Sequence, residues 1–466
     1  MPLPTTFRMA FQSGKLPVPN GTTLGGYGWQ GPRTANGSVA NPLKVRCVII
    51  ESAGGQRVVF LQADVISIPK PVYEQILGEL MDAGVVSAPE NFVLAQSHTH
   101  AGPMVGTKPD PYVLLDASTE DTKRYTNETF VPFLVSIAEQ AHARALVDVT
   151  LGYAEGFAEI GVNRRGLAWT PREVPVLVAR RTDNRDLFAV LVGHTCHPVC
   201  SGWMLPTQDA DYCGYAMDEV EKRLGVPVVF FQGAAGDINP APAPEGVNQT
   251  AFAAGRLVAA VVATVRNAAF FPIHGPITTD IRTVNLNYAV DLDDPFERAA
   301  LLEKYRVRKR GLQGDERMLG YRHAVRVLEE FEAGDVLNHM PMTIQKIDLG
   351  GLTILTMSHE VLSGWHVGTK AKWAARKATP LWVMGYVNHI DCYVPAFDVH
   401  SAGDLAGTDQ GEAGWRAGGD PKVVAPGTYS HSYSLVAPLN PGDSPTDPAG
   451  VEGTLVPHID DMLGLV

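Results

Sequence analysis

Residues 91–103, NFVLAQSHTHAGP, constrain the fold more than any other stretch, because an apolar run ends there in two histidines, a glycine and a proline. The run has the apolar, partly β-branched character of a core strand, and Gly102-Pro103 turns the chain directly after it. Side chains alternate along a strand, so His98 and His100 are expected to point the same way. Neutral imidazole is the commonest protein ligand for zinc, so the stretch predicts a metal at a strand end. An HxH pair alone also caps ordinary turns, so the prediction depends on the rest of the chain.

The composition is typical of a globular protein with a large core. Of the 466 residues, 45% are hydrophobic and 19% are charged, and no linker or charge block divides the chain, so we expect one large domain over 1–466. The net charge of -12 and the pI near 5.6 argue against a nucleic acid or an anionic membrane surface as the main partner. We therefore expect a small-molecule or lipid-like substrate. The oligomeric state does not follow from the sequence.

Two further features predict a cytoplasmic protein. The N-terminus has no apolar segment of the length that a secretion signal needs, and nowhere do about 18 apolar residues run together as a membrane helix requires. Five cysteines, an odd number, fit reduced thiols better than a disulfide framework. Cys196 and Cys200 flank a histidine and a proline, so ligation of a metal by thiolate is an alternative to buried free thiols.

The pattern of the first stretch recurs at the end of other apolar runs. Residues 187–192 lead into GHTCHPVCSG, where His194 and His197 are three residues apart. At a strand end this spacing brings only one of the two to a common site.

Three more apolar runs end in residues that are typical of sites. Residues 226–231 end in QGAAGDINP, residues 352–357 in Ser-His-Glu, and residues 382–387 in NHIDCY. Five buried strands thus stop at metal-ligating or catalytic residue types. This favours one common site at the edge of a sheet.

The overall pattern predicts an α/β (α+β) fold, with a large mixed β-sheet core flanked by helices and the metal site at the strand ends. Residues 45–50 and 57–61 form a predicted hairpin, and a helix is expected after Pro69. Asp64 lies between them, and it is either a carboxylate that orients a ligand histidine or a cap of that helix. Further helices are predicted over 122–146, 208–224, 249–268, 293–334 and 451–464.

Two loops carry candidate substrate contacts. Residues 20–40 are dense in glycine and include Tyr27, which suits an ordered loop that approaches a site closely. Asn163, Arg164 and Arg165 have a turn-like context. Adjacent arginines are usually solvated, but one that faces a pocket is able to bind a substrate carbonyl, carboxylate or hydroxyl.

Several of these segments together resemble the neutral ceramidase family of zinc amidases. They occur in the same order over most of residues 20–395, and residues 396–466 are rich in loops. The segments are FVLAQSHTHAGP, VNRR, GHTCHPV, DADYCGYA, FFQGAAGDINP, the Ser-His-Glu after TILTM, and the NxxxCYV segment. The resemblance implies that His98, His197, Glu360 and Tyr393 hold one zinc. His389 is an alternative to Tyr393, and His100 and Arg164 match positions that line the family's substrate site.

The chain also departs from the family pattern. Asn239 replaces the serine of the GDxSP motif, so this segment offers no serine nucleophile. We expect no C-terminal immunoglobulin-like domain and no secretion signal. An intracellular relative that acts on a smaller, more polar substrate than ceramide is therefore expected.

These observations predict a zinc-dependent amidohydrolase of linear amides or related esters, with one zinc per chain. Zinc lowers the pKa of a bound water to about 7, which provides a nucleophile. His100 is then the proton carrier, Arg164 and Asn239 hold the substrate, Tyr27 contacts it, and Asp64 orients a ligand. A metal-dependent lyase or isomerase of a polyhydroxylated or carbonyl substrate is the alternative. A structural zinc site is a third, although such sites are typically rich in cysteine.

Overall fold

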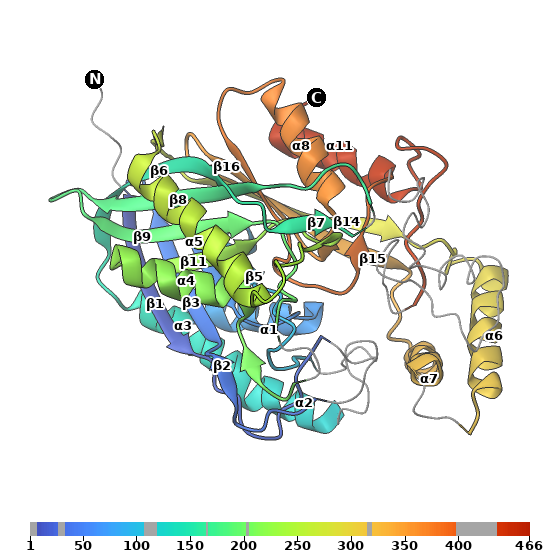
Figure 1. Cartoon of the computed structure of the whole chain (residues 1–466). Helices are drawn as coiled ribbons and strands as arrows, with labels where there is room; N and C mark the ends of the chain where they lie inside the picture. The colour runs from blue at the N-terminus through green and yellow to red at the C-terminus, as the bar shows by residue number, and fades with distance from the viewer. Residues whose placement is uncertain are drawn as a thin grey trace.

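The computed structural model describes residues 7–26, 33–106, 119–164, 166–201, 205–314, 319–397 and 436–466. Its core consists of two β-sheets that pack face to face, with helices on the outer face of each (Figure 1). This mixed α/β architecture confirms the predicted fold class. The second sheet adds a layer that the sequence patterns did not resolve.

The larger sheet has nine strands in the order β11-β9-β8-β6-β1-β3-β4-β5, with β13 paired to β6. Their bounds are β1 Phe7–Lys15, β3 Lys44–Glu51, β4 Arg57–Ala63, β5 Phe92–Gln96, β6 Val147–Phe157, β8 Glu173–Arg181, β9 Leu187–His194, β11 Val228–Gln232 and β13 Phe271–Ile273. The second sheet has the order β14-β15-β16-β18, with β14 Thr278–Asn287, β15 His339–Asp348, β16 Thr353–Met357 and β18 Leu381–Met384.

Three two-stranded pairs lie outside these sheets: β2 (Val39–Asn41) with β10 (Gln208–Asp209), β7 (Gly161–Asn163) with β12 (Ile238–Pro240), and β17 (Glu360–Val361) with β19 (Tyr393–Val394). The last two pairs carry candidate site residues.

The helices form the outer layers. On the large sheet lie α1 (Lys70–Asp82) and α3 (Val131–His142) over one half, and α4 (Asp211–Leu224) and α5 (Gln249–Asn267) over the other. On the second sheet lie α8 (Ser363–Ala374) and α11 (Val451–Leu463), while α6 (Pro295–Gly311) and α7 (Leu319–Ala333) pair at one end of the molecule (Figure 1). The predicted helix over 122–146 is interrupted, because α2 (Thr119–Tyr125) joins α3 through a π-helical turn at Thr126–Phe130.

Alternation along the strands explains this layering. In β5 every residue is buried, but Phe92 and Leu94 pack beneath α1 and α3 while Val93 and Ala95 pack against the second sheet. A strand covered on both faces has no polar side, and this is why its sequence is an unbroken apolar run.

The site lies where parallel strands end together. Three pairs of adjacent strands are parallel, namely β4 with β5, β9 with β11, and β16 with β18, so within each pair the carboxyl ends lie at the same edge. The segment after β18 joins the two edges of the large sheet, because Gly385 donates to Gln232 O (3.1 Å) while Gln96 donates to Tyr386 O (3.0 Å).

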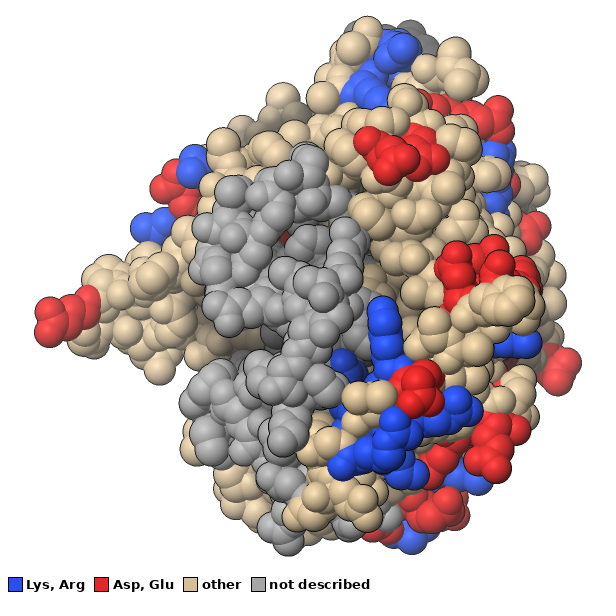
Figure 2. All heavy atoms as spheres, turned by 90° about the vertical axis from the view of Figure 1, so that its right-hand side faces the viewer, with Lys and Arg blue, Asp and Glu red and all other residues tan. Residues whose placement is uncertain are grey.

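The face that carries α6 and α7 is unevenly charged. Figure 2 shows Lys and Arg side chains gathered in its lower part, with Asp and Glu scattered around them. The last turn of α6 contains Arg308, Lys309 and Arg310, of which Arg308 is buried, and cations there suit the negative end of the helix dipole. Within the described residues, no helix combines the length and apolar character needed to cross a bilayer.

Candidate metal centre

Three histidines from two strand ends converge on one point. The Nε2 atom of His98 lies 3.1 Å from Nε2 of His197 and 3.3 Å from Nε2 of His100. All three side chains are buried, and their ligand atoms are close enough to share one metal ion. His98 and His100 follow β5, and His197 follows β9.

Backbone carbonyls determine which ring nitrogens face inward. Nδ1 of His98 lies 2.6 Å from Ile66 O, Nδ1 of His197 lies 2.8 Å from Ala235 O, and Nδ1 of His100 lies 3.1 Å from Gly26 O. A carbonyl only accepts, so each Nδ1 carries the proton and each Nε2 presents a lone pair to the centre. This is the orientation that metal-binding imidazoles take.

The imidazoles of His100 and His197 stay neutral in this setting. Burial lowers the pKa of His197 to about 4, and burial together with the neighbouring histidines lowers the pKa of His100. Neutral rings are the metal-binding form, but facing lone pairs repel one another unless a cation lies between them.

Glu360 completes the group from β17, which follows β16 of the second sheet. Its Oε2 atom lies 3.2 Å from Nε2 of His98 and 3.3 Å from Nε2 of His197, and its side chain is 13% exposed. Burial alone would raise the pKa of Glu360, but the two histidines lower it well below its usual value. The carboxylate is therefore ionised, as a metal ligand must be.

The spacing of these atoms fits zinc. Tetrahedral zinc with ligands at about 2.0–2.2 Å places any two ligand atoms roughly 3.3–3.5 Å apart. Nε2 of His98, Nε2 of His197 and Oε2 of Glu360 lie 3.1–3.3 Å from one another. Two imidazoles and a carboxylate form a ligand set that catalytic zinc sites use, with a further position left for water or substrate.

The convergence depends on left-handed backbone. The strand ends at Gln96, and His98 has φ of 66°, so His98 and His100 meet through a turn and not through strand alternation as predicted. His359, Tyr386 and Asn388 also have positive φ. Four of the six non-glycine residues with positive φ in the described part thus lie in the loops around this site, and strained backbone of this kind gathers at functional sites.

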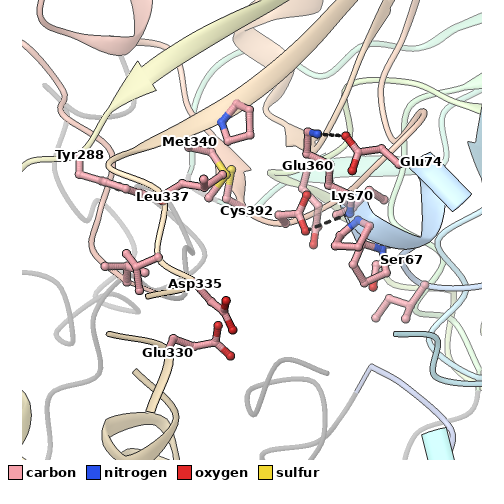
Figure 3. Close-up of a pocket in the computed structure, with 18 of the residues that line it drawn as sticks. Ser67, Lys70, Glu74, Tyr288, Glu330, Asp335, Leu337, Met340, Glu360 and Cys392 are labelled. Atoms are coloured by element: carbon pink, nitrogen blue, oxygen red, sulfur yellow. Dashed lines mark hydrogen bonds and ion pairs between the residues drawn. The ribbon is translucent and has the colours of Figure 1, made fainter. Parts of the chain in front are cut away.

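A cavity of about 520 Å³ reaches this group from the side of Glu360. Figure 3 shows Glu360 and Cys392 on one wall, Tyr288, Leu337 and Met340 on another, and Glu330 and Asp335 pointing in from the opposite side. The cavity is large enough for a small organic molecule, and its walls offer both apolar and charged contacts.

The fold of this chain is similar to that of two solved ceramidase structures. A neutral ceramidase from Pseudomonas aeruginosa matches with a TM-score of 0.65 at 19% identity, over 86% of this chain and 71% of that chain. A ceramidase complexed with C2 matches with a TM-score of 0.66 at 17% identity, over 93% of this chain and 79% of that chain. The chain has the neutral ceramidase fold. This match confirms the resemblance predicted from the motifs. No protein-family model and no curated protein matches the chain.

Within the neutral ceramidase fold, two tyrosines lie beside Glu360. Tyr393 is on β19, directly opposite Glu360 on β17, and its ring lies 5.7 Å from the guanidinium carbon of Arg164. Tyr386 has its hydroxyl 3.3 Å from Oε2 of Glu360, and its ring lies 4.5 Å from that of His98. Tyr386 is not among the residues predicted for the site, although its place just after a buried strand is a signal of a site residue. His389 lies in a separate group with His359 and Asp391.

Arg164 and Asn239, the residues predicted to bind a substrate, lie next to β7 and on β12. Arg164 donates from its side chain to Gly236 O and from its backbone to Asp237 O. The Oδ1 atom of Asn239 is buried and has no hydrogen-bond partner among the described residues. Asp237 fixes this region, because its carboxylate accepts from Asn163 (2.8 Å) and from the backbone of Ser363 (2.7 Å).

Asp64 does not orient a histidine. Its buried carboxylate accepts from Arg46 (3.2 Å), Gln62 (2.8 Å) and the backbone of Lys44 (2.9 Å). The carbonyls of Ile66 and neighbouring loops take the orienting role instead. The expectation for Asp64 is corrected, because the side chain turns toward the Arg46 guanidinium beside it.

Three other expectations concern residues around the group. His194 turns away from it, with Nδ1 3.3 Å from Glu173 O. Cys196 and Cys200 are free thiols, and burial raises the pKa of both, so neither favours the thiolate form. Tyr27 lies outside the described residues.

Proposed function

We propose that this chain is a zinc-dependent hydrolase that cleaves a linear amide or a related ester with a metal-activated water. The single observation that carries the proposal is the close approach of Nε2 of His98, Nε2 of His197 and Oε2 of Glu360, within 3.1–3.3 Å of one another. The ceramidase fold supports the same reaction class. Zinc supplies Lewis-acid polarisation of a carbonyl and lowers the pKa of a bound water to about 7.

The residues of the chain have separate tasks in this proposal. His98, His197 and Glu360 hold the zinc, and one of the nearby tyrosines is the candidate fourth ligand. His100 is neutral at pH 7, with the Nε2 lone pair turned inward, so it is placed to take a proton and return it to the leaving nitrogen or oxygen. Asn239 and Arg164 bind the carbonyl or hydroxyl groups of the substrate.

The cavity supports a substrate with both apolar and polar parts. Met104, Leu337, Met340 and Ile390 line it together with Glu330, Asp335 and Asp391. A small or lipid-like amide fits such walls, whereas a purely hydrocarbon ligand would leave the carboxylates desolvated. The location of the protein in the cytoplasm stays a prediction of the sequence.

Product analysis in isotope-labelled water tests the reaction class. We expect a panel of linear N-acyl amides and esters to include substrates whose carboxylate product carries one labelled oxygen, because hydrolysis places one oxygen atom of water in the carboxylate. A product formed without incorporation of the label would contradict the hydrolase and favour the lyase or isomerase.

Glu360→Gln tests the carboxylate ligand. The amide keeps the shape of the side chain but removes its charge, so we expect zinc affinity to fall by roughly 10- to 100-fold while the fold is retained. Competition with a chromophoric chelator measures the affinity. Glu79→Gln is the matched control, because it makes the same change on the exposed side of α1. Equal zinc affinity in Glu360→Gln and wild type would remove Glu360 from the ligand set.

A further inference from the structure

A second group of buried titratable side chains lies directly beside Glu360. His359, His389 and Asp391 have ligand atoms close enough to hold a metal ion. Both histidine side chains are fully buried, and their rings cross at 90° with centroids 4.7 Å apart. The group is therefore either a second metal site or a hydrogen-bond network that holds the backbone of Glu360 in position.

The ring of His359 has no lone pair left for a metal. Its Nε2 lies 3.0 Å from Pro341 O, and a carbonyl only accepts, so Nε2 carries the proton. Its Nδ1 accepts the backbone N–H of Asp391 at 3.0 Å. One donor and one acceptor are all that a neutral imidazole offers, so the protein itself satisfies both nitrogens.

His389 is satisfied in the same way. Its Nδ1 donates to Oδ2 of Asp391 at 2.8 Å, since a carboxylate accepts. Its Nε2 then accepts from the hydroxyl of Thr343 at 3.0 Å. Both rings are thus fully hydrogen-bonded, which is the pattern of a structural network and not of a metal site.

Backbone hydrogen bonds join the segment that carries Glu360 to the segment 386–392. The backbone N–H of His359 donates to His389 O (2.9 Å), Tyr386 donates to His359 O (3.2 Å), and Glu360 donates to Cys392 O (3.0 Å). His359 itself has φ of 69°, a conformation that a residue with a side chain adopts only when its surroundings enforce it. The two ring bonds of His359 provide that enforcement.

We infer that His359 is a positioning residue, whose ring bonds to Pro341 and Asp391 hold the backbone that aims the Glu360 carboxylate at His98 and His197. The inference rests on the proposed function, because it assigns Glu360 to a metal. Outer partners of this kind typically change metal affinity by 10- to 100-fold.

His359→Asn tests the inference. Asparagine tolerates the left-handed backbone but does not reach both ring partners. We expect one zinc per chain at saturation, with zinc affinity 10- to 100-fold weaker than in the wild-type protein by chelator competition. His323→Asn is the matched control, because His323 is equally buried but lies on α7, where its ring packs against Tyr305; we expect its zinc affinity to equal that of wild type.

A second, milder variant shows whether a loss of zinc affinity results from misfolding. Thr343→Val keeps the shape of the side chain and removes only the hydroxyl that bonds His389, so we expect about a five-fold loss of zinc affinity. The melting temperature of each metal-free protein is measured alongside.

The outcomes separate the inference from the proposed function. Lower melting temperatures with unchanged zinc affinity in both variants would show a merely structural role and overturn the inference. Two zinc ions per wild-type chain, reduced to one in His359→Asn, would make the group a metal site and overturn the inference while leaving the proposed function intact. A wild-type protein that binds no metal would overturn the proposed function, and the inference with it.

Discussion

His98→Ala is expected to lose bound zinc and activity together, whereas His100→Ala is expected to keep zinc and lose on the order of 10²–10⁴ in turnover. His98 is central, because its Nε2 lies 3.1 Å from His197, 3.2 Å from Glu360 and 3.3 Å from His100. The ring of His100 lies farther from that of His197, with centroids 5.6 Å apart against 4.7 Å for His98. Metal content and rate, measured on both variants, separate the two roles.

Chemical rescue sharpens this comparison. If His100 carries protons, added imidazole should restore part of the turnover of His100→Ala without changing its zinc content. The same addition should not restore His98→Ala unless the imidazole also restores the metal. Equal loss of zinc in both variants would make His100 a ligand and leave the proton carrier unassigned.

His197→Ala is expected to weaken zinc binding by more than about 100-fold, beyond the range that outer partners reach, while His194→Ala keeps it. The two histidines form a matched pair, because both are 1% exposed and both lie at the end of β9, His194 as its last residue and His197 three residues later. Only His197 presents Nε2 to the group, at 3.1 Å from His98 and 3.3 Å from Glu360. His194 instead faces Glu173 O.

Isothermal titration of zinc into metal-free protein measures both variants, and folding is checked by the melting temperature of the metal-free forms. Loss of zinc binding in His194→Ala with retention in His197→Ala would show that the opposite side of this turn faces the metal.

The sequence was informative about the strand ends because burial on both faces leaves a strong pattern. An apolar run such as 92–95 indicates a buried segment, and the polar residues that follow it are easy to recognise. Such endings and the family resemblance together predict His98, His197 and Glu360 as ligands, and the structure brings all three together. The chain order alone does not show that β17, which follows β16 of the second sheet, provides Glu360.

Three features of the structure could not be predicted from the sequence, for physical reasons. The left-handed backbone at His98 and Tyr386 has no glycine to signal it, so strand alternation gave the wrong geometry for His98 and His100. Eight of the ten residues of β14 are partly or fully exposed, and its sequence TTDIRTVNLN lacks the apolar run that marks β5. Asp64 was misassigned because a carboxylate after a strand looks the same whether a buried arginine or a histidine lies beside it.

The zinc content of the purified protein is the most direct test of the account. Inductively coupled plasma mass spectrometry on protein of known concentration is expected to find about one zinc per chain. Removal of that zinc by a chelator is expected to abolish hydrolysis, and added zinc to restore it. Protein that contains no transition metal, and whose activity is indifferent to chelators, would contradict the assignment of His98, His197 and Glu360 as a catalytic metal centre.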